Sequence, residues 1–111
     1  MKKIFLLCTL FIVKLYSFDI GETLWQGNCI TCHHPTKSIS APSAKEIKQR
    51  YLTVFPQKED FVAFMAQWVH NPQSKTSIMD DAIKKYGLMP QMAFPLDTTT
   101  DIAKYLYKTE F

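Results

Sequence analysis

The sequence has little glycine and no pattern typical of β-strands. It contains 3 glycines in 111 residues, so few positions suit a tight turn or a close approach of two backbones. No stretch alternates cleanly between apolar and polar residues, which argues against half-buried strands. Internal repeats and low-complexity tracts are also missing. With 47% apolar and 21% charged residues, the chain is typical of one small folded domain.

An apolar run long enough to span a membrane is missing too. Lys2 and Lys3 precede the mostly apolar residues 4–13, whereas a spanning helix needs about 20 apolar residues. A basic end before a short apolar run is typical of a secretory signal peptide, which we expect over residues 1–17. Residues 18–111 are then the domain, exported across the inner membrane of a Gram-negative bacterium to the periplasm. The alternative is an uncleaved leader that lies on the membrane surface.

The mature chain also lacks an excess of positive charge. The whole chain has 13 Lys+Arg and 10 Asp+Glu residues, a net charge of +3. The expected leader contains three of these bases, Lys2, Lys3 and Lys14, and no acid, so 10 of each remain. Because nothing concentrates positive charge on one face, nucleic acid is not expected as a partner.

Helical periodicity dominates the rest of the chain. We expect helices over residues 21–28, 45–53, 80–86 and 97–108. Gly87 is the expected stop of the third of these, and Asp97 the expected N-cap of the last. A further helix is expected between Pro56 and Asn71, with an apolar face formed by Phe61, Phe64, Met65, Trp68 and Val69.

Cysteine is scarce, and its position is informative. Cys8 lies in the expected leader, so the mature chain has only Cys29 and Cys32, with His33 directly after them. A C-x-x-C-H run is the attachment signature of c-type haem, in which the thiols bind the porphyrin edge and the histidine binds iron.

Three other interpretations of the motif are weaker. A zinc site needs four ligands, and the chain has neither a second C-x-x-C nor an H-x-x-x-H run. A thioredoxin-like dithiol needs a βαβ context, which the missing strand patterns do not supply. A disulfide between Cys29 and Cys32 closes only a small loop and constrains little.

Around this motif the chain resembles the small bacterial class I (monohaem) cytochromes c. Residues 21–29, Gly-Glu-Thr-Leu-Trp-Gln-Gly-Asn-Cys, are similar to the first helix of that family, and residues 103–106, Ala-Lys-Tyr-Leu, to its last. The resemblance implies an all-α class I cytochrome c fold, with about four to five short helices wrapped around one covalent haem c. It also implies that the first and last helices cross at Gly21. The expected contact joins Gly21 and Trp25 to Ile102, Tyr105 and Leu106.

The resemblance implies a methionine as the sixth iron ligand, opposite His33. We expect Met89, because it precedes Pro90 in the loop before the last helix, and prolines stiffen a loop. Met92 is the alternative, or packs beside the haem. Met65 belongs to the apolar helix face, and Met79 fits either the core or the surface.

Histidine ligation is the rival. His70 is expected to cap a helix C-terminus, with ligation of iron as the alternative. His34 directly follows the proximal histidine and is expected to be a solvated loop residue.

The resemblance further implies that the carbonyl of Pro42 accepts the second ring N–H of His33, although the loop between them has no glycine. Four side chains have two open roles, either contact with haem propionates or ordinary packing and solvation: Arg50, Tyr51, Trp68 and Tyr86.

The expected function is that of a monomeric periplasmic electron carrier, with redox proteins as partners and no catalytic residues. It is expected to contact a membrane only through partner complexes or an uncleaved leader. Two alternatives are a haem c subunit of a larger oxidoreductase and a haem-based sensor.

Overall fold

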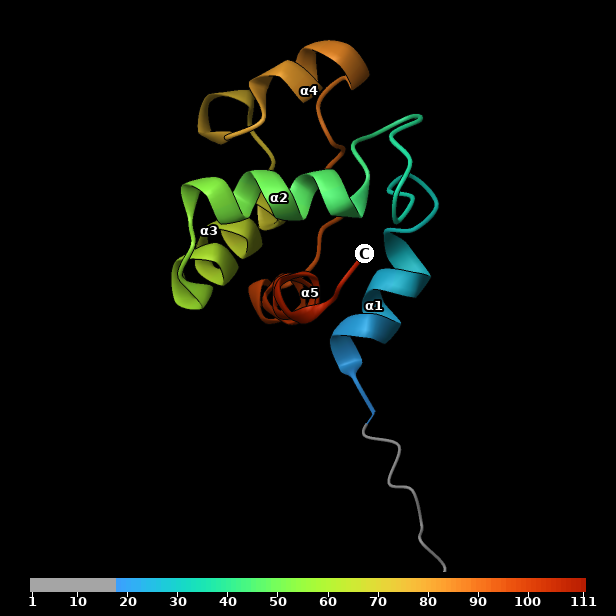
Figure 1. Ribbon diagram of the computed structural model, residues 1–111, viewed down its shortest axis with the longest axis vertical. Helices are drawn as coiled ribbons and strands as arrows, with labels where there is room; N and C mark the ends of the chain where they lie inside the picture. Colours follow the sequence, from blue (N-terminus) through green and yellow to red (C-terminus); the bar gives the residue numbers. More distant parts are fainter. Residues whose placement is uncertain (1–17) are drawn as a thin grey trace, which may run out of the picture.

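The computed structural model describes residues 18–111, which form helices and loops without any strand (Figure 1). The elements are α1 (Ile20–Asn28), α2 (Ala44–Val54), α3 (Lys58–His70), the short 3-10 helix η1 (Ser74–Thr76), α4 (Asp80–Tyr86) and α5 (Leu96–Lys108). The expectation of an all-α fold is confirmed for this part of the chain. The expected signal peptide, residues 1–17, lies outside the described residues.

Local sequence signals account for the helix ends. The carboxylate of Asp19 accepts hydrogen bonds from the backbone N–H groups of Gly21 and Glu22 and so begins α1. Ser43 caps α2 in the same way, through the N–H of Glu46. Gly87 ends α4 as expected, with a φ of +89° that favours glycine.

The expected N-cap of the last helix was wrong by two residues. Pro95 is the N-cap of α5, and its carbonyl accepts the N–H of Thr99. The carboxylate of Asp97 instead accepts the N–H of its neighbour Thr98, within the first turn. There its negative charge still favours the helix, because the N-terminal end of the helix dipole is positive.

Helix α5 lies between α1 on one side and α3 on the other (Figure 1). At the crossing with α1, an added Cβ on Gly21 would lie 2.3 Å from the carbonyl oxygen of Asp101 and 2.8 Å from Cβ of Tyr105. Trp25 and Tyr105 pack there with ring centroids 6.4 Å apart. The predicted crossing of the first and last helices at Gly21 is therefore present.

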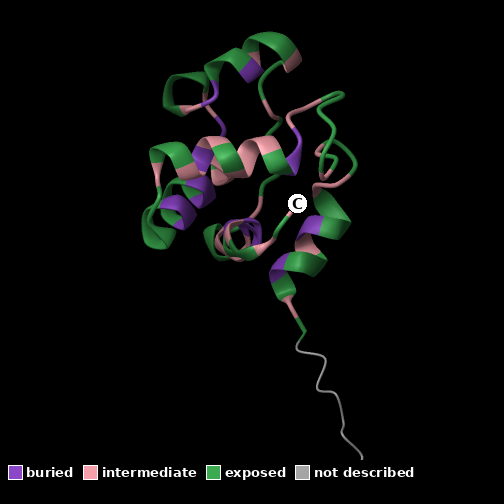
Figure 2. Cartoon of the chain, viewed as in Figure 1, coloured by how far each residue is buried: buried purple, intermediate pink, exposed green. Residues whose placement is uncertain are grey.

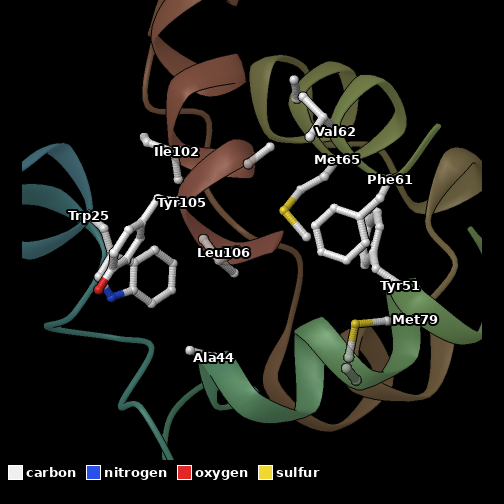
Figure 3. Packing of buried hydrophobic residues seen from close by; sticks show 13 residues of the cluster. Trp25, Ala44, Tyr51, Phe61, Val62, Met65, Met79, Ile102, Tyr105 and Leu106 are labelled. Carbon is white, nitrogen blue, oxygen red and sulfur yellow. The ribbon is translucent and has the colours of Figure 1, made fainter. Parts of the chain in front are cut away.

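The core continues from this crossing to α2, α3 and α4 (Figures 2 and 3). Met65 is buried, as expected, and Met79 belongs to the core as well. Phe61 is fully buried and packs edge-on against Tyr51, with ring centroids 5.7 Å apart. Figure 3 shows Leu106 of α5 between the Trp25–Tyr105 pair and this second group.

The predicted apolar face of α3 was only partly right. Phe64 is 55% exposed and stacks on Phe55, with centroids 4.2 Å apart, while Val62 and Ala66 are buried instead. The buried face of α3 is the one that packs on α5, where the hydroxyl of Thr99 also donates to the carbonyl of Ala66.

Candidate functional site

The cysteine–histidine motif forms a tight turn at the end of α1. Cys29 is the C-cap residue, and its N–H donates to the carbonyl of Trp25 at 2.9 Å. The carbonyl of Cys29 in turn accepts the N–H groups of Cys32 at 3.2 Å and of His33 at 2.9 Å. The two thiols and the imidazole are therefore held on one turn of backbone.

The two thiols differ in their surroundings. Both are free, but Cys29 is half-buried and Cys32 is exposed. Burial, with a smaller contribution from the charge of Cys32, raises the pKa of the Cys29 thiol to about 11. At neutral pH the thiol of Cys29 is therefore mostly protonated.

The ring of His33 is fixed by a hydrogen bond to Pro42. Its Nδ1 lies 2.7 Å from the carbonyl oxygen of Pro42, the contact that the resemblance implied. A carbonyl oxygen can only accept, so Nδ1 carries the hydrogen. In the neutral ring Nε2 then keeps its lone pair and is free to bind a metal.

The loop between these residues is ordered without glycine. The carbonyls of His34 and Pro35 accept the first N–H groups of α2, from Ala44 and Lys45, both at 3.0 Å. These N–H groups at the start of the helix have no acceptor inside α2 itself, so the loop supplies their acceptors. The hydroxyl of Ser38 accepts the N–H of Ser43. Pro42 therefore has a fixed position directly before the helix.

Trp25 lies beside the histidine ring. The centroids of Trp25 and His33 are 6.0 Å apart, and Trp25 is only 3% exposed. Its neighbour Tyr105 connects it to α5. The contact between α1 and α5 thus supports both the fold and the position of His33.

Met89, the expected ligand, and Met92, its alternative, lie in the segment between α4 and α5. Met89 is half-buried and Met92 is 39% exposed. The segment leaves α4 at Gly87 and includes Ala93, whose φ of +57° lies in the left-handed region that side chains disfavour. Both methionines therefore lie on this loop, and Met89 is the less exposed of the two.

His70 is attached to this same loop, which sequence reasoning did not foresee. Its Nδ1 lies 2.7 Å from the carbonyl oxygen of Phe94, 24 residues further along the chain. His34 is exposed, and its Nδ1 accepts N–H groups from Thr36 and Lys37 within its own loop. Its expected place in a solvent-exposed loop is confirmed.

Four side chains were expected either to contact haem propionates or to pack and be solvated in the ordinary way, and most of them have protein partners. Arg50 forms a bidentate pair with Asp81, at 2.9 and 2.7 Å, which joins α2 to α4. The indole N–H of Trp68 donates to the carbonyl of Gln73. Tyr51 is buried in the core, and burial raises its pKa to about 12. Tyr86 is half-buried beside the amine of Lys85.

The position of Pro42 directly before α2 has a signal in the sequence that the expectations above did not include. Ser43-Ala44-Lys45-Glu46 has the S-x-x-E pattern of a capping box, which marks a helix start. It would have placed Pro42 directly before α2. In the structure the carboxylate of Glu46 accepts the Ser38 hydroxyl instead of the Ser43 N–H.

Two further findings concern the whole described chain. Within residues 18–111, no group of three or more His, Cys, Asp or Glu side chains is arranged to hold a metal ion. None of the helices in that range is both long and apolar enough to cross a membrane.

Comparison of the chain with protein-family models, with curated proteins and with solved structures gave no match. The features that bear on function are the chemistry of the motif turn, its hydrogen bond to Pro42 and the loop that carries Met89.

Proposed function

We propose that the chain is a class I c-type cytochrome that carries single electrons between redox proteins in the periplasm. One haem c is held by thioether bonds to Cys29 and Cys32, and its iron by Nε2 of His33 and the sulfur of Met89. The observation that carries this proposal is the hydrogen bond from Nδ1 of His33 to Pro42, with both thiols on the same turn.

The residues present fit this group. An axial histidine needs one ring nitrogen with a free lone pair and a second nitrogen that is held by an acceptor, and His33 meets both requirements. Thioether formation needs two free thiols close to that histidine, and Cys29 and Cys32 are free. Trp25 supports one side of the His33 ring, so the ring cannot turn freely.

Each side chain then has a defined task. When bound, the haem supplies reversible one-electron chemistry between Fe(III) and Fe(II). Pro42 keeps His33 in one tautomer and one orientation. The thioether of Met89 is soft and uncharged, so it favours the reduced state and raises the potential. Because His33 and Met89 would both hold the iron, the protein would carry electrons and would leave no position at the iron for a substrate.

The proposal extends to the fold and to the partners. The helices of residues 18–111 would wrap around the haem as in class I cytochromes c, and the protein would act as a monomer. A reductase and an oxidase would dock transiently at the haem edge, through small and weak contacts.

Expression with a cytochrome c maturation system tests the proposal. The full chain should gain the mass of one haem, and Cys29→Ser with Cys32→Ser should abolish this gain. In the oxidised protein we expect the Met–Fe(III) charge-transfer band, which Met89→Leu removes and the matched variant Met92→Leu keeps. Wild-type protein without covalent haem would refute the proposal. Loss of the band only in Met92→Leu would reassign the ligand, and rapid CO binding to the reduced protein would contradict the carrier role.

A further inference from the structure

The loop between α4 and α5 is held by very few hydrogen bonds. Within the described chain, residues 18–111, the bond from His70 to Phe94 is the only hydrogen bond that any residue from 88 to 94 makes. On the α4 side the last anchors are the N–H of Gly87, which donates to the carbonyl of Ile83, and the ion pair of Arg50 with Asp81. The candidate ligand Met89 lies inside this unanchored stretch.

The anchor is placed beside the strained residue of the loop. Ala93, with its φ of +57°, directly precedes Phe94, whose carbonyl His70 contacts at 2.7 Å. A left-handed backbone at a residue with a side chain costs free energy and persists only where its surroundings hold it. A fixed carbonyl at position 94 supplies such a constraint.

His70 is well suited to fix this carbonyl. It is the last residue of α3, and α3 packs along α5 in the core, so its backbone belongs to the rigid part of the molecule. The donor is a ring N–H, and the half-buried imidazole has little freedom to turn away. Phe94 is thereby tied to α3 immediately before Pro95 begins α5.

We infer that His70 is a positioning residue that holds the Met89 loop closed and so keeps the methionine on the iron. This inference rests on the proposed function for the ligand role of Met89. The attachment of the loop to α3 is independent of it. His70 acts through the backbone of Phe94 and is not itself a ligand.

Competition with imidazole tests the ligand role. Exogenous imidazole, titrated into the oxidised holoprotein, displaces a methionine ligand and removes the Met–Fe(III) band, so its affinity measures how easily the loop opens. A hydrogen bond of this kind corresponds to about a twofold to tenfold change in an equilibrium constant. His70→Phe should therefore bind imidazole about two to ten times more tightly than the wild type. His70→Asn, which keeps an N–H donor near the position of Nδ1, should restore most of the difference.

Thr99→Val is the matched control. It removes another side-chain donor to a backbone carbonyl of α3, that of Ala66, but the Thr99 hydroxyl forms no hydrogen bond with residues 88–94. It should lower the thermal midpoint and leave the imidazole affinity unchanged. An equal gain in affinity in Thr99→Val and His70→Phe would overturn the inference, as would no gain in His70→Phe. The inference would also be overturned if the wild type lacked the Met–Fe(III) band and the iron became high-spin in His70→Phe, because His70 would then itself be the ligand.

Limited chymotrypsin digestion gives a readout that needs no haem. His70→Phe should be cut faster after Leu88 than the wild type, and His70→Asn and Thr99→Val should not. If covalent haem is absent, the proposed function fails, but digestion still decides whether His70 holds the loop. Equal cutting in all four proteins would refute the anchor itself.

Discussion

The imidazole of His33 and the carbonyl of Pro42 are 2.7 Å apart, although they are nine positions apart in the chain. This hydrogen bond fixes which nitrogen of His33 is free. It depends on the start of α2, because Pro42 directly precedes the N-cap residue Ser43. The orientation of the candidate iron ligand is therefore linked to a helix cap.

Loss of this cap should lower the stability of the protein. Ser43 is 3% exposed, and its hydroxyl accepts the N–H of Glu46 at 3.1 Å. We expect Ser43→Ala to reduce the free energy of unfolding by about 1 kcal/mol, measured by denaturant titration. Ser40→Ala, at an exposed loop position, is the control and should change little. Equal stability of the two variants would contradict the role of the cap.

The crossing of α1 and α5 should tolerate no side chain at position 21. Gly21→Ala places a methyl group 2.3 Å from the carbonyl oxygen of Asp101, so the helices must separate. We expect a loss of about 1–3 kcal/mol in the free energy of unfolding, or more.

Gly27→Ala is the matched control for that substitution, because an added Cβ meets nothing within 4 Å. Alanine is a better helix former than glycine, so this variant should gain up to about 1 kcal/mol. Thermal or chemical unfolding should show that the change in the free energy of unfolding has opposite signs in the two variants. A destabilised Gly27→Ala, or an unaffected Gly21→Ala, would be inconsistent with the crossing.

The ion pair between Arg50 and Asp81 should make stability depend on acid pH. The Arg50 guanidinium lowers the pKa of Asp81 from 3.8 to about 2 in the folded protein. A carboxyl with a lowered folded pKa stabilises the protein above its unfolded pKa, and this contribution is lost as pH falls from about 4 toward 2. Thermal midpoints should therefore fall more steeply in this window for the wild type than for Asp81→Asn.

Asp80→Asn is the control for the pH experiment, because it removes the same charge from a looser pair with Lys84, at 3.6 Å. The dependence of its thermal midpoint on acid pH should stay closer to that of the wild type. Because the Arg50–Asp81 pair lies at the surface, added salt should weaken its effect. Identical profiles for Asp81→Asn and the wild type would mean that the pair does not stabilise the fold.

The two thiols should react at different rates in protein that is made without haem attachment. Cys32 is exposed, whereas Cys29 is half-buried and its pKa is raised to about 11. Because the thiolate is the reactive form, we expect iodoacetamide to modify Cys32 first at pH 8. Peptide mass spectrometry of partly modified protein measures the ratio. Preferential modification of Cys29 would contradict the burial described here.

The helices were the most predictable part of the fold. The expected helix over residues 80–86 has the same bounds as α4, since Gly87 marks its end unambiguously. The packed face of α3 was less predictable. Phe64 has the right spacing for the core, but it stacks on Phe55 near the surface, and nothing in the spacing distinguishes it from Val62.

In the candidate site, contacts between residues that are close in sequence were easier to predict than contacts between distant residues. The motif turn of Cys29, Cys32 and His33 is local, and its internal hydrogen bonds follow from the geometry of a helix end. The contact with Pro42 was expected only from the resemblance to a family. The contact between His70 and Phe94 was not expected at all, because it joins segments that only the packing of α3 and α5 brings together.

The sequence by itself determined the local features of this protein: the helices and most of their ends, and the presence of two thiols and an imidazole on one turn. These depend on propensities, caps and spacings within a few residues. Only the tertiary structure decided which nitrogen of His33 is free, which methionine is less exposed and what holds the loop before α5. Those features depend on backbone carbonyls, which carry no sequence signal and gain a specific partner only when distant helices pack together.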